Sequence, residues 1–522
     1  MYPLKHQAMH SFWKTFGGLF LAAAVWSQTP RATLTLQQAL ETTLLHPQAR
    51  IGEQQILASR GVQREASGIF DPLYSSGVRQ SFAPTPLSTA QQVSDGSGSP
   101  KAAFTNLTTF NGGASQLYRS GVTAGPIVEL DRSRDRLLNA AGINQSRLAY
   151  QVTIPLLRNR GPDVVAARET AAGVQVQASV LDLNQTYTDL LASTAASYWG
   201  LVGALRLAAV AASSEERGRM LLQNVQDLIR ADRIPRSDLN QVRANLADRT
   251  AGRIEAEQQV VVARQQLALA MGVPPEQIAT VPDPAEGFPE IPAPANDADS
   301  VRRYIVLALS QRADYLAAQK RVEAQRKLLP PATNAFRPAI DLTFSAGYSG
   351  LREGLYPNSY LASLVYGVHG LDAVGGVRYE FAPRNNAAAG ALAQVESAIR
   401  QAELLADTSA RAISSEVVVS LEGVRNAGLR LAKAHESVEA FQAALDGERE
   451  KYRLGFGSLV DILTTEDRLT TSLIVEVQAR LEAAVELARL RHATGTLVEP
   501  NATAPRVDRQ AFVTLPALPG DR

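Results

Sequence analysis

The feature that most constrains the fold is a stretch without proline that runs from Arg384 to Glu499. Proline removes a helical hydrogen bond and breaks helices, so this stretch can form helices of unusual length. A helix from about Ala387 to Arg453 would be roughly 100 Å long if unbroken, which no compact globular core needs. Farther along, apolar residues recur at spacings of seven and four and therefore share one helix face. They are Ile462, Leu469, Leu473, Val477, Leu481 and Val485.

The break in this stretch lies at Leu454–Ser458, with the sequence Leu-Gly-Phe-Gly-Ser. Two glycines followed by a serine are typical of a turn and of the N-terminus of the next helix. The sequence therefore predicts a long antiparallel helical hairpin, and a second one with its turn at Ala231 to Arg236. An intracellular coiled coil is the alternative. The abundant alanine and the several apolar stripes favour helices that touch neighbours on both sides, as in a ring.

Three segments of the chain align without gaps to later segments. They are 41–72 with 307–338, 158–159 with 384–385, and 230–272 with 453–495. Their common order predicts an internal structural repeat. The separation between partners falls along the chain because the first copy carries extra residues near 84–145. This stretch is rich in Ser, Thr, Gly and Asn, so we expect an insertion in exposed loops.

The predicted organisation has a signal peptide over 1–27, a first repeat over 28–273, a proline-rich linker over 274–299, a second repeat over 300–498 and a tail over 499–522. In the leader, Lys5 and Lys14 accompany a short apolar stretch from Phe16 to Trp26. This stretch is shorter than the ~20 apolar residues of a membrane-spanning helix, and a buried helix or an anchor is the alternative. No later stretch is expected to cross a bilayer as a helix.

Four runs alternate between apolar and polar residues, which is typical of strands. They are Tyr74 to Phe82, Arg147 to Ile154, Ile340 to Ser349 and Gly376 to Phe381. One apolar and one mostly polar face fit a membrane barrel, although a soluble sheet alternates in the same way. The leader and the long loops favour the membrane. Four strands cannot enclose water and an open edge is not viable in lipid, so other copies must complete the barrel, in a number left open.

Several classes of function are disfavoured by composition. The formal net charge is only +1, which does not suggest nucleic-acid binding. The absence of cysteine excludes a thiol nucleophile, a cysteine zinc site and disulfides. The six histidines have no metal-ligand spacing. Neither a Gly-rich phosphate loop nor a His-Glu-x-x-His or Gly-x-Ser-x-Gly motif occurs. We therefore expect no catalytic residues, no metal and no cofactor.

Three motifs resemble the TolC-like outer-membrane efflux family. They are Leu34-x-Leu36-x-x-Ala39-Leu40 followed by His46-Pro47, the run from Pro155 to Gly161, and Tyr452-Arg453-Leu454-Gly455 with Asp461-Ile462-Leu463 and Leu469. The resemblance covers roughly 33–498. It implies an α+β membrane protein that forms a homotrimer in the outer membrane, with a large periplasmic part. Each protomer would give four strands to a twelve-stranded β-barrel, continued by a long α-helical barrel.

The same resemblance implies a passive exit duct. An inner-membrane pump of the RND, ABC or another type would drive the substrate, and a periplasmic adaptor would dock onto the helical end. A soluble periplasmic helical adaptor or scaffold is the alternative function. It would lack membrane strands, so heat-modifiable trimers in an outer-membrane fraction would argue against it.

The resemblance also implies candidate site residues near the helical turns. Asp461 would lie in the constriction of the resting channel, where symmetry repeats it as an acidic ring that filters ions. Tyr452 would help to hold the closed state, and Arg453 and Asp238 are placed in the same gating region. Helix N-terminal capping is the alternative role for both carboxylates. The family's second acid is Thr464 here, and a basic gating position of some members is Gly457.

The adaptor-contacting tip is expected at the two turns. The second turn would contribute Leu454, Gly455 and Phe456, and the first would contribute Ala231, Asp232 and Arg233. The first turn lacks the Leu-Gly pair of the second. The closed-state contacts are therefore expected to differ from those of the family.

Overall fold

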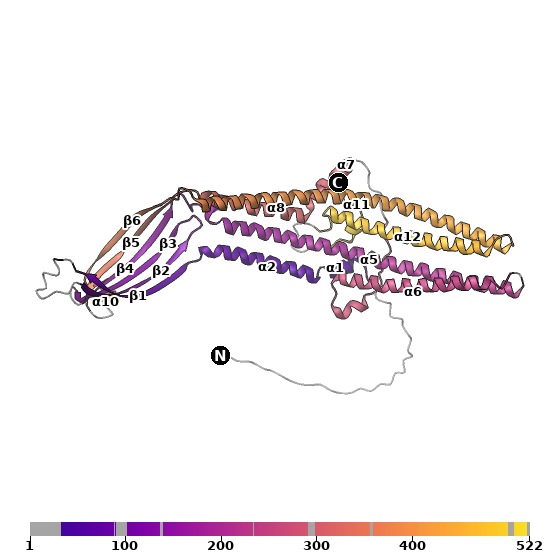
Figure 1. Ribbon diagram of the computed structural model, residues 1–522, viewed down its shortest axis with the longest axis horizontal. Helices are drawn as coiled ribbons and strands as arrows, with labels where there is room; N and C mark the ends of the chain where they lie inside the picture. The colour runs from indigo at the N-terminus through magenta and orange to yellow at the C-terminus, as the bar shows by residue number, and fades with distance from the viewer. Residues whose placement is uncertain are drawn as a thin grey trace, which may run out of the picture.

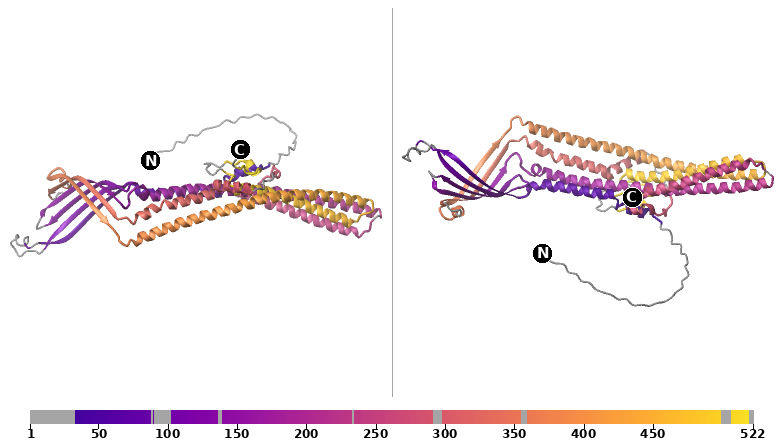
Figure 2. Two further views of the ribbon diagram at one scale, coloured as in Figure 1. Left: turned by 90° about the horizontal axis from the view of Figure 1, so that it is seen from above. Right: turned by 60° about the horizontal axis from the view of Figure 1, so that its bottom comes forward.

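The computed structural model describes residues 33–87, 89, 102–135, 139–232, 234–290, 298–354, 359–498 and 506–518. The predicted leader over 1–27, Arg233 and much of the tail lie outside these residues. The molecule is elongated, with a curved β-sheet at one end and the turns of two long helical hairpins at the other (Figure 1). The two views of Figure 2 show the same separation of sheet and hairpin tips.

Strands and helices follow one another in a simple order. The first half contains α1 (Leu36–Thr43), α2 (Pro47–Ser67), η1 (Gly68–Phe70), β1 (Leu73–Pro86), β2 (Ala102–Leu117), β3 (Thr123–Asp135), β4 (Asn139–Pro155), α4 (Pro162–Val165), α5 (Ala167–Arg230), α6 (Asp238–Met271) and η2 (Pro275–Thr280). The second half contains α7 (Ala298–Gln311), α8 (Ala313–Arg326), α9 (Leu329–Asn334), β5 (Ala339–Glu353), α10 (Ser359–Ala362), β6 (Val368–Glu380), α11 (Asn386–Arg453), α12 (Leu459–Ala493) and η3 (Arg509–Phe512).

In the part of the chain that the structure describes, the sheet contains six strands in the order β1-β2-β3-β4-β5-β6, and every neighbouring pair is antiparallel. The prediction of four strands per protomer is therefore wrong. The 84–145 stretch is not only loop, because it holds β2, β3 and the turn between them. The alternation of apolar and polar residues does not reveal these strands, because Thr, Asn and Gly fill seven of the sixteen positions of β2 and charged residues interrupt β3. These two strands are stabilised by pairing with their neighbours in the sheet, and the sequence does not display that pairing.

The register gives the sheet two different faces. One face carries large apolar side chains from every strand, and many of them are exposed. They include Val78, Phe82, Phe104, Leu148, Tyr150, Phe344 and Val377. The opposite face is mostly polar, and there Arg147 of β4 forms ion pairs with Glu129 of β3 at 3.6 Å and Asp372 of β6 at 2.8 Å. The apolar face thus continues into β2 and β3, but less regularly than in the four strands predicted from the sequence.

The predicted helical hairpins are confirmed. Helix α11 has 68 residues and α5 has 64, so α11 spans roughly 100 Å at 1.5 Å per residue. Asn385 starts α11 in the left-handed conformation and accepts a hydrogen bond from the Ala388 amide through its side chain. The turns to α6 and α12 lie where the sequence places them, after Arg230 and Arg453.

The main core lies in the middle of the molecule, where α1, α5, α6 and α12 meet the linker and the tail. Tyr198, Trp199 and Phe512 are fully or almost fully buried there. Within the described chain, α5 alone is long and apolar enough to cross a membrane by length and composition, contrary to our expectation that no such stretch follows the leader. The packing of Tyr198 and Trp199 in this core accounts for that apolar composition.

Candidate functional site

The two hairpin turns lie at the same end of the molecule, far from the sheet (Figure 1). A small apolar cluster joins the hairpins just behind the turns. Val225 of α5 and Val242 of α6 pack with Leu459 and Leu463 of α12. The predicted tip and constriction residues are therefore brought together in one region.

The second turn is shaped by Gly455, whose φ is +83°. The amide of Phe456 donates to the Lys451 carbonyl at 2.9 Å and the amide of Gly455 donates to the Tyr452 carbonyl at 3.0 Å. This pattern closes the C-terminus of a helix and favours glycine at the left-handed position. It leaves Leu454 57% and Phe456 86% exposed, so the turn presents two large apolar side chains to its surroundings.

The first turn also has a residue in the left-handed conformation, but this residue is not glycine. Asp232 takes the left-handed conformation with φ of +52°, and its amide donates to the Ile229 carbonyl at 3.0 Å. Aspartate tolerates this conformation better than most residues. Ala231 and Asp232 are exposed at the tip, while Arg233 lies outside the described residues.

Tyr452 lies between the two hairpins, packed against the apolar cluster. Its hydroxyl is buried and has no hydrogen-bond partner among the described residues. Burial raises the pKa of Tyr452, and the negative charge of Asp238 adds to the increase. Tyr452 and Asp238 therefore sit close enough to interact electrostatically across the hairpins, as members of one predicted gating region.

Asp461 forms a capping box with Ser458 at the start of α12. The Asp461 amide donates to Ser458 Oγ at 3.1 Å, and Asp461 Oδ2 accepts from the Ser458 hydroxyl at 2.7 Å and from its amide at 3.4 Å. The capping alternative is thus present in the structure. Asp461 is nevertheless exposed, so its charge is available to other groups.

The remaining gating candidates have local partners. Arg453 pairs with Glu450 one helical turn earlier at 2.7 Å, and both side chains are exposed. Asp238 lies in the first turn of α6 and accepts a hydrogen bond from the Ser237 hydroxyl at 3.2 Å. A carboxylate at this position favours the helix N-terminus.

A buried ionic network behind the tips was not predicted. Glu466 of α12 is 1% exposed and accepts from Arg249 of α6 at 2.5 Å and from Arg449 of α11 at 2.7 Å. Arg249 also donates to Asp467 at 3.1 Å and to the Ser214 carbonyl of α5 at 3.2 Å. The network therefore joins all four hairpin helices.

A signal for this network does exist in the sequence. Glu466 falls on the apolar stripe of α12, four residues after Ile462 and three before Leu469. A charge on a face that is otherwise buried requires a partner, because burying an unpaired charge is costly. The position of the partner, more than 200 residues away at Arg249, is set only by the fold.

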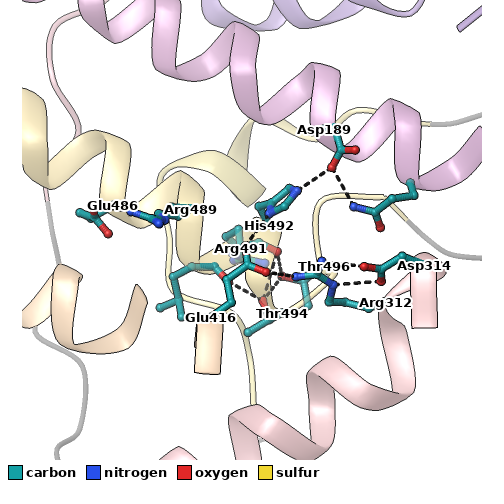
Figure 3. Close-up of polar contacts among 12 residues, drawn as sticks. Asp189, Arg312, Asp314, Glu416, Glu486, Arg489, Arg491, His492, Thr494 and Thr496 are labelled. Carbon is teal, nitrogen blue, oxygen red and sulfur yellow. Dashed lines mark hydrogen bonds and ion pairs between the residues drawn. The ribbon is translucent and has the colours of Figure 1, made fainter. Parts of the chain in front are cut away.

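A second ionic cluster lies near the middle of the molecule, where α5, α11 and α12 meet the segment between α7 and α8 (Figure 3). His492 contacts Asp189 at 2.7 Å and Glu416 at 3.2 Å, and Arg312 reaches Glu416 at 2.5 Å and Asp314 at 2.8 Å. Burial opposes the charge of His492, but the hydrogen bonds to Asp189 and Glu416 outweigh it and raise the pKa to about 9. The hydrogen bond from His492 lowers the pKa of Glu416 to about 2. Arg312 contributes to this decrease, whereas burial acts in the opposite direction.

No protein-family model matches the chain, and no curated protein matches its sequence. Solved structures do match its fold. The outer-membrane channel OprN is 17% identical, with 88% of this chain and 90% of OprN covered at a TM-score of 0.64. The CmeC outer-membrane channel of Campylobacter jejuni is 13% identical, with 92% of both chains covered at 0.63.

A third match is the outer-membrane protein VceC of Vibrio cholerae. It is 17% identical, with 88% of this chain and 96% of VceC covered at a TM-score of 0.60. These matches span the sheet and the helical hairpins together, because they cover nearly the whole length of both chains. The chain therefore has the fold of the TolC-like outer-membrane channels.

Proposed function

We propose that this chain is a subunit of an outer-membrane channel that provides a passive exit duct across the outer membrane and the periplasm. The observation that carries the proposal is a two-faced sheet joined end-on to helical hairpins of roughly 100 Å. An apolar face suits lipid and a polar face suits a water-filled bore. The helices would supply a shaft that extends roughly 100 Å away from the sheet.

The strand lengths are consistent with this location. The six strands have 13 to 17 residues, and a strand needs about 9–11 residues to cross the hydrocarbon layer of a membrane. The sheet must also close, since an open edge is not viable in lipid. A homotrimer would close the sheets into a barrel and the hairpins into an α-helical tube. The two halves of each chain would be copies of one repeated unit.

The function is transport, not catalysis. Substrate would move through the bore under the drive of an inner-membrane pump, coupled through a periplasmic adaptor. The exposed Leu454 and Phe456 suit the adaptor contact, because paired apolar side chains at a tip need a partner surface. Gly455, Ala231, Asp232 and Arg233 would complete that contact surface.

The constriction would form just behind the tips. Asp461, repeated by symmetry, would make an acidic ring that attracts cations and filters ions. Tyr452, with Asp238 and Arg453 beside it, would hold the hairpins in the closed arrangement. The apolar packing of Tyr452 between the two hairpins supports this role, because opening must separate those helices.

The proposal is tested by cell fractionation followed by planar-bilayer recording with the purified full-length chain. We expect a heat-modifiable oligomer in the outer-membrane fraction and discrete conductance steps after reconstitution. A soluble periplasmic monomer without conductance would contradict the proposal and would favour the helical adaptor or scaffold.

A further inference from the structure

We propose that three copies of this chain close a barrel of eighteen strands, in which β1 of one copy pairs with β6 of the next. The inference rests on the trimeric channel proposed above and concerns the width of its outer-membrane section. It follows from the six strands of each copy, since three such sheets contain eighteen strands in total.

The hairpin of β2 and β3 continues the apolar face of the sheet at several rows, although Asn106, Thr108, Arg132 and Arg134 also lie on that face. On the apolar face, Phe110 of β2 lies opposite Val78 of β1 and Leu130 of β3, and Val128 lies opposite Leu148 of β4. The ring of Phe104 stacks on that of Phe82 with centroids 5.7 Å apart. An extracellular loop has no reason to maintain this alternation, whereas a strand between lipid and water requires it.

The opposite face of the hairpin is polar in the same rows. Thr109 of β2 lies between Arg79 of β1 and Asp131 of β3, and Asn111 lies opposite Glu129. Glu129 then contacts Arg147 of β4. The polar face is therefore continuous from the inserted hairpin to the strands that the sequence alternation identifies.

The turn between β2 and β3 is fixed at the junction of sheet and helices. Arg119 forms a two-point ion pair with Glu169 of α5 at 2.7 and 2.8 Å, and its guanidinium carbon lies 4.7 Å from the ring centre of Phe70. The amide of Gly161 donates to the Ser120 carbonyl at 2.9 Å. The turn of the β2–β3 hairpin thus lies at the end of the sheet where β4 leaves it, and β2 and β3 run across the sheet as the neighbouring strands do.

The two edge strands of the sheet match in length and direction, so they can pair with each other between copies. Strands β1 and β6 have no outer neighbour within the described part of the chain, and they contain 14 and 13 residues. Because the number of strands is even and every pair is antiparallel, β6 of one copy meets β1 of the next in the antiparallel sense. A second copy can therefore satisfy the edge along its full length, with both faces continued.

The consequence is a wider outlet. Barrel diameter grows roughly linearly with strand number, so eighteen strands enclose a cross-section roughly twice that of twelve. The helical tube is built from the same hairpins in either case. We infer that the outer-membrane section is not the step that limits the size of the cargo.

The first test measures which face of β2 meets water. The chain has no cysteine, so a single introduced thiol reports alone. Thr109→Cys and Phe110→Cys are a matched pair, adjacent in sequence and on opposite faces. In outer membranes we expect a membrane-impermeant maleimide to modify Thr109→Cys at least tenfold faster than Phe110→Cys. Equal, fast reaction at both sites would place the hairpin outside the wall and overturn the inference.

The second test measures the contact between copies. Ser76→Cys of β1 is combined in turn with Leu371→Cys, Ala373→Cys or Gly375→Cys of β6, all on the apolar face. Oxidation is expected to give covalent dimers and trimers, and no larger species, with at least one partner position. The control is Ser76→Cys with Gly112→Cys, which lie opposite each other within one chain, so oxidation should consume both thiols without forming dimers or trimers.

The possible failures are distinguishable. If no oligomer and no conductance are found, the proposed channel itself fails. If a conducting complex contains two copies, or three copies whose β1 and β6 never cross-link, the channel remains and the eighteen-stranded wall is wrong. Conducting trimers with cross-linked edges and alternating reactivity in β2 establish it.

Discussion

At the scale of single side chains, charged residues on buried helix faces link the two hairpins through ion pairs. Glu466 is the most buried of these among the described residues, and both Glu466 and its partner Arg249 are paired through more than one hydrogen bond. A buried ion pair is weak evidence of net stabilisation, but breaking it leaves an uncompensated charge. The two effects can be separated by mutation.

We expect Glu466→Gln to destabilise the protein by about 3 kcal/mol, because Arg249 and Arg449 lose their shared partner. The double variant Arg249→Met with Glu466→Leu should recover most of that loss, since it removes both charges. Denaturant unfolding of the purified protein measures the change. Lys433→Ala, which breaks an exposed pair with Glu436, is the control and should change the stability far less than Glu466→Gln does. A double variant as unstable as Glu466→Gln would contradict this interpretation.

The His492 cluster makes a prediction about pH. The folded pKa of about 9 exceeds the ordinary value of 6.5, so protonation of His492 stabilises the fold fully below pH 6.5. This contribution is lost as pH rises through about 9 and is at most about 3 kcal/mol. The melting temperature of His492→Gln should therefore fall below that of the wild type at pH 6 and approach it at pH 10. A difference in melting temperature that is constant with pH would exclude the charged histidine as the cause.

At the scale of elements, the backbone conformation of a turn decides which residues it accepts. Gly455 is held at a positive φ, yet a Cβ there would meet no heavy atom within 4 Å. Gly455→Val is therefore strained by its backbone conformation alone, by roughly 1–2 kcal/mol. We expect it to disturb the tip and weaken adaptor docking while the heat-modifiable oligomer persists, as measured by co-purification with the adaptor.

Gly447→Ala is the matched control for that variant. Gly447 lies within α11 on an exposed surface, and a Cβ there also meets nothing within 4 Å. Alanine favours a helix over glycine by roughly 1 kcal/mol, so this variant should bind the adaptor normally. Normal efflux by Gly455→Val cells would remove the tip assignment.

The elements differ in how far the sequence determines them. The helices of the second hairpin were predictable because their proline-free length leaves few alternatives, and the break at Gly455 fixes the turn. Strands β2 and β3 were not, since Thr108, Asn111 and Gly113 give little contrast between faces. The capping role of Asp461 could be read from Ser458 three residues earlier. The partners of Glu466 and His492 could not, because they come from distant helices.

The role proposed for Asp461 depends on the whole assembly, because an acidic ring exists only when copies surround an axis. We expect Asp461→Ala to raise single-channel conductance or weaken block by divalent cations. Asp461→Asn is the decisive companion, since the asparagine oxygen can still accept the hydrogen bonds of the capping box but the side chain carries no charge. Both variants should alter conductance or block in planar bilayers. If only the alanine variant does so, the residue acts through the cap of α12 and not through a charged ring.

The central claim is that sheets and hairpins from several copies close into one continuous duct. Electron cryo-microscopy of the full-length complex, extracted from the outer membrane, tests it most directly. We expect three copies around one axis, a closed barrel with β1 beside β6 of the neighbour, and a hollow helical shaft ending at Gly455. A monomer, or an assembly in which the sheet edges remain open and no bore passes through the helices, would contradict the account.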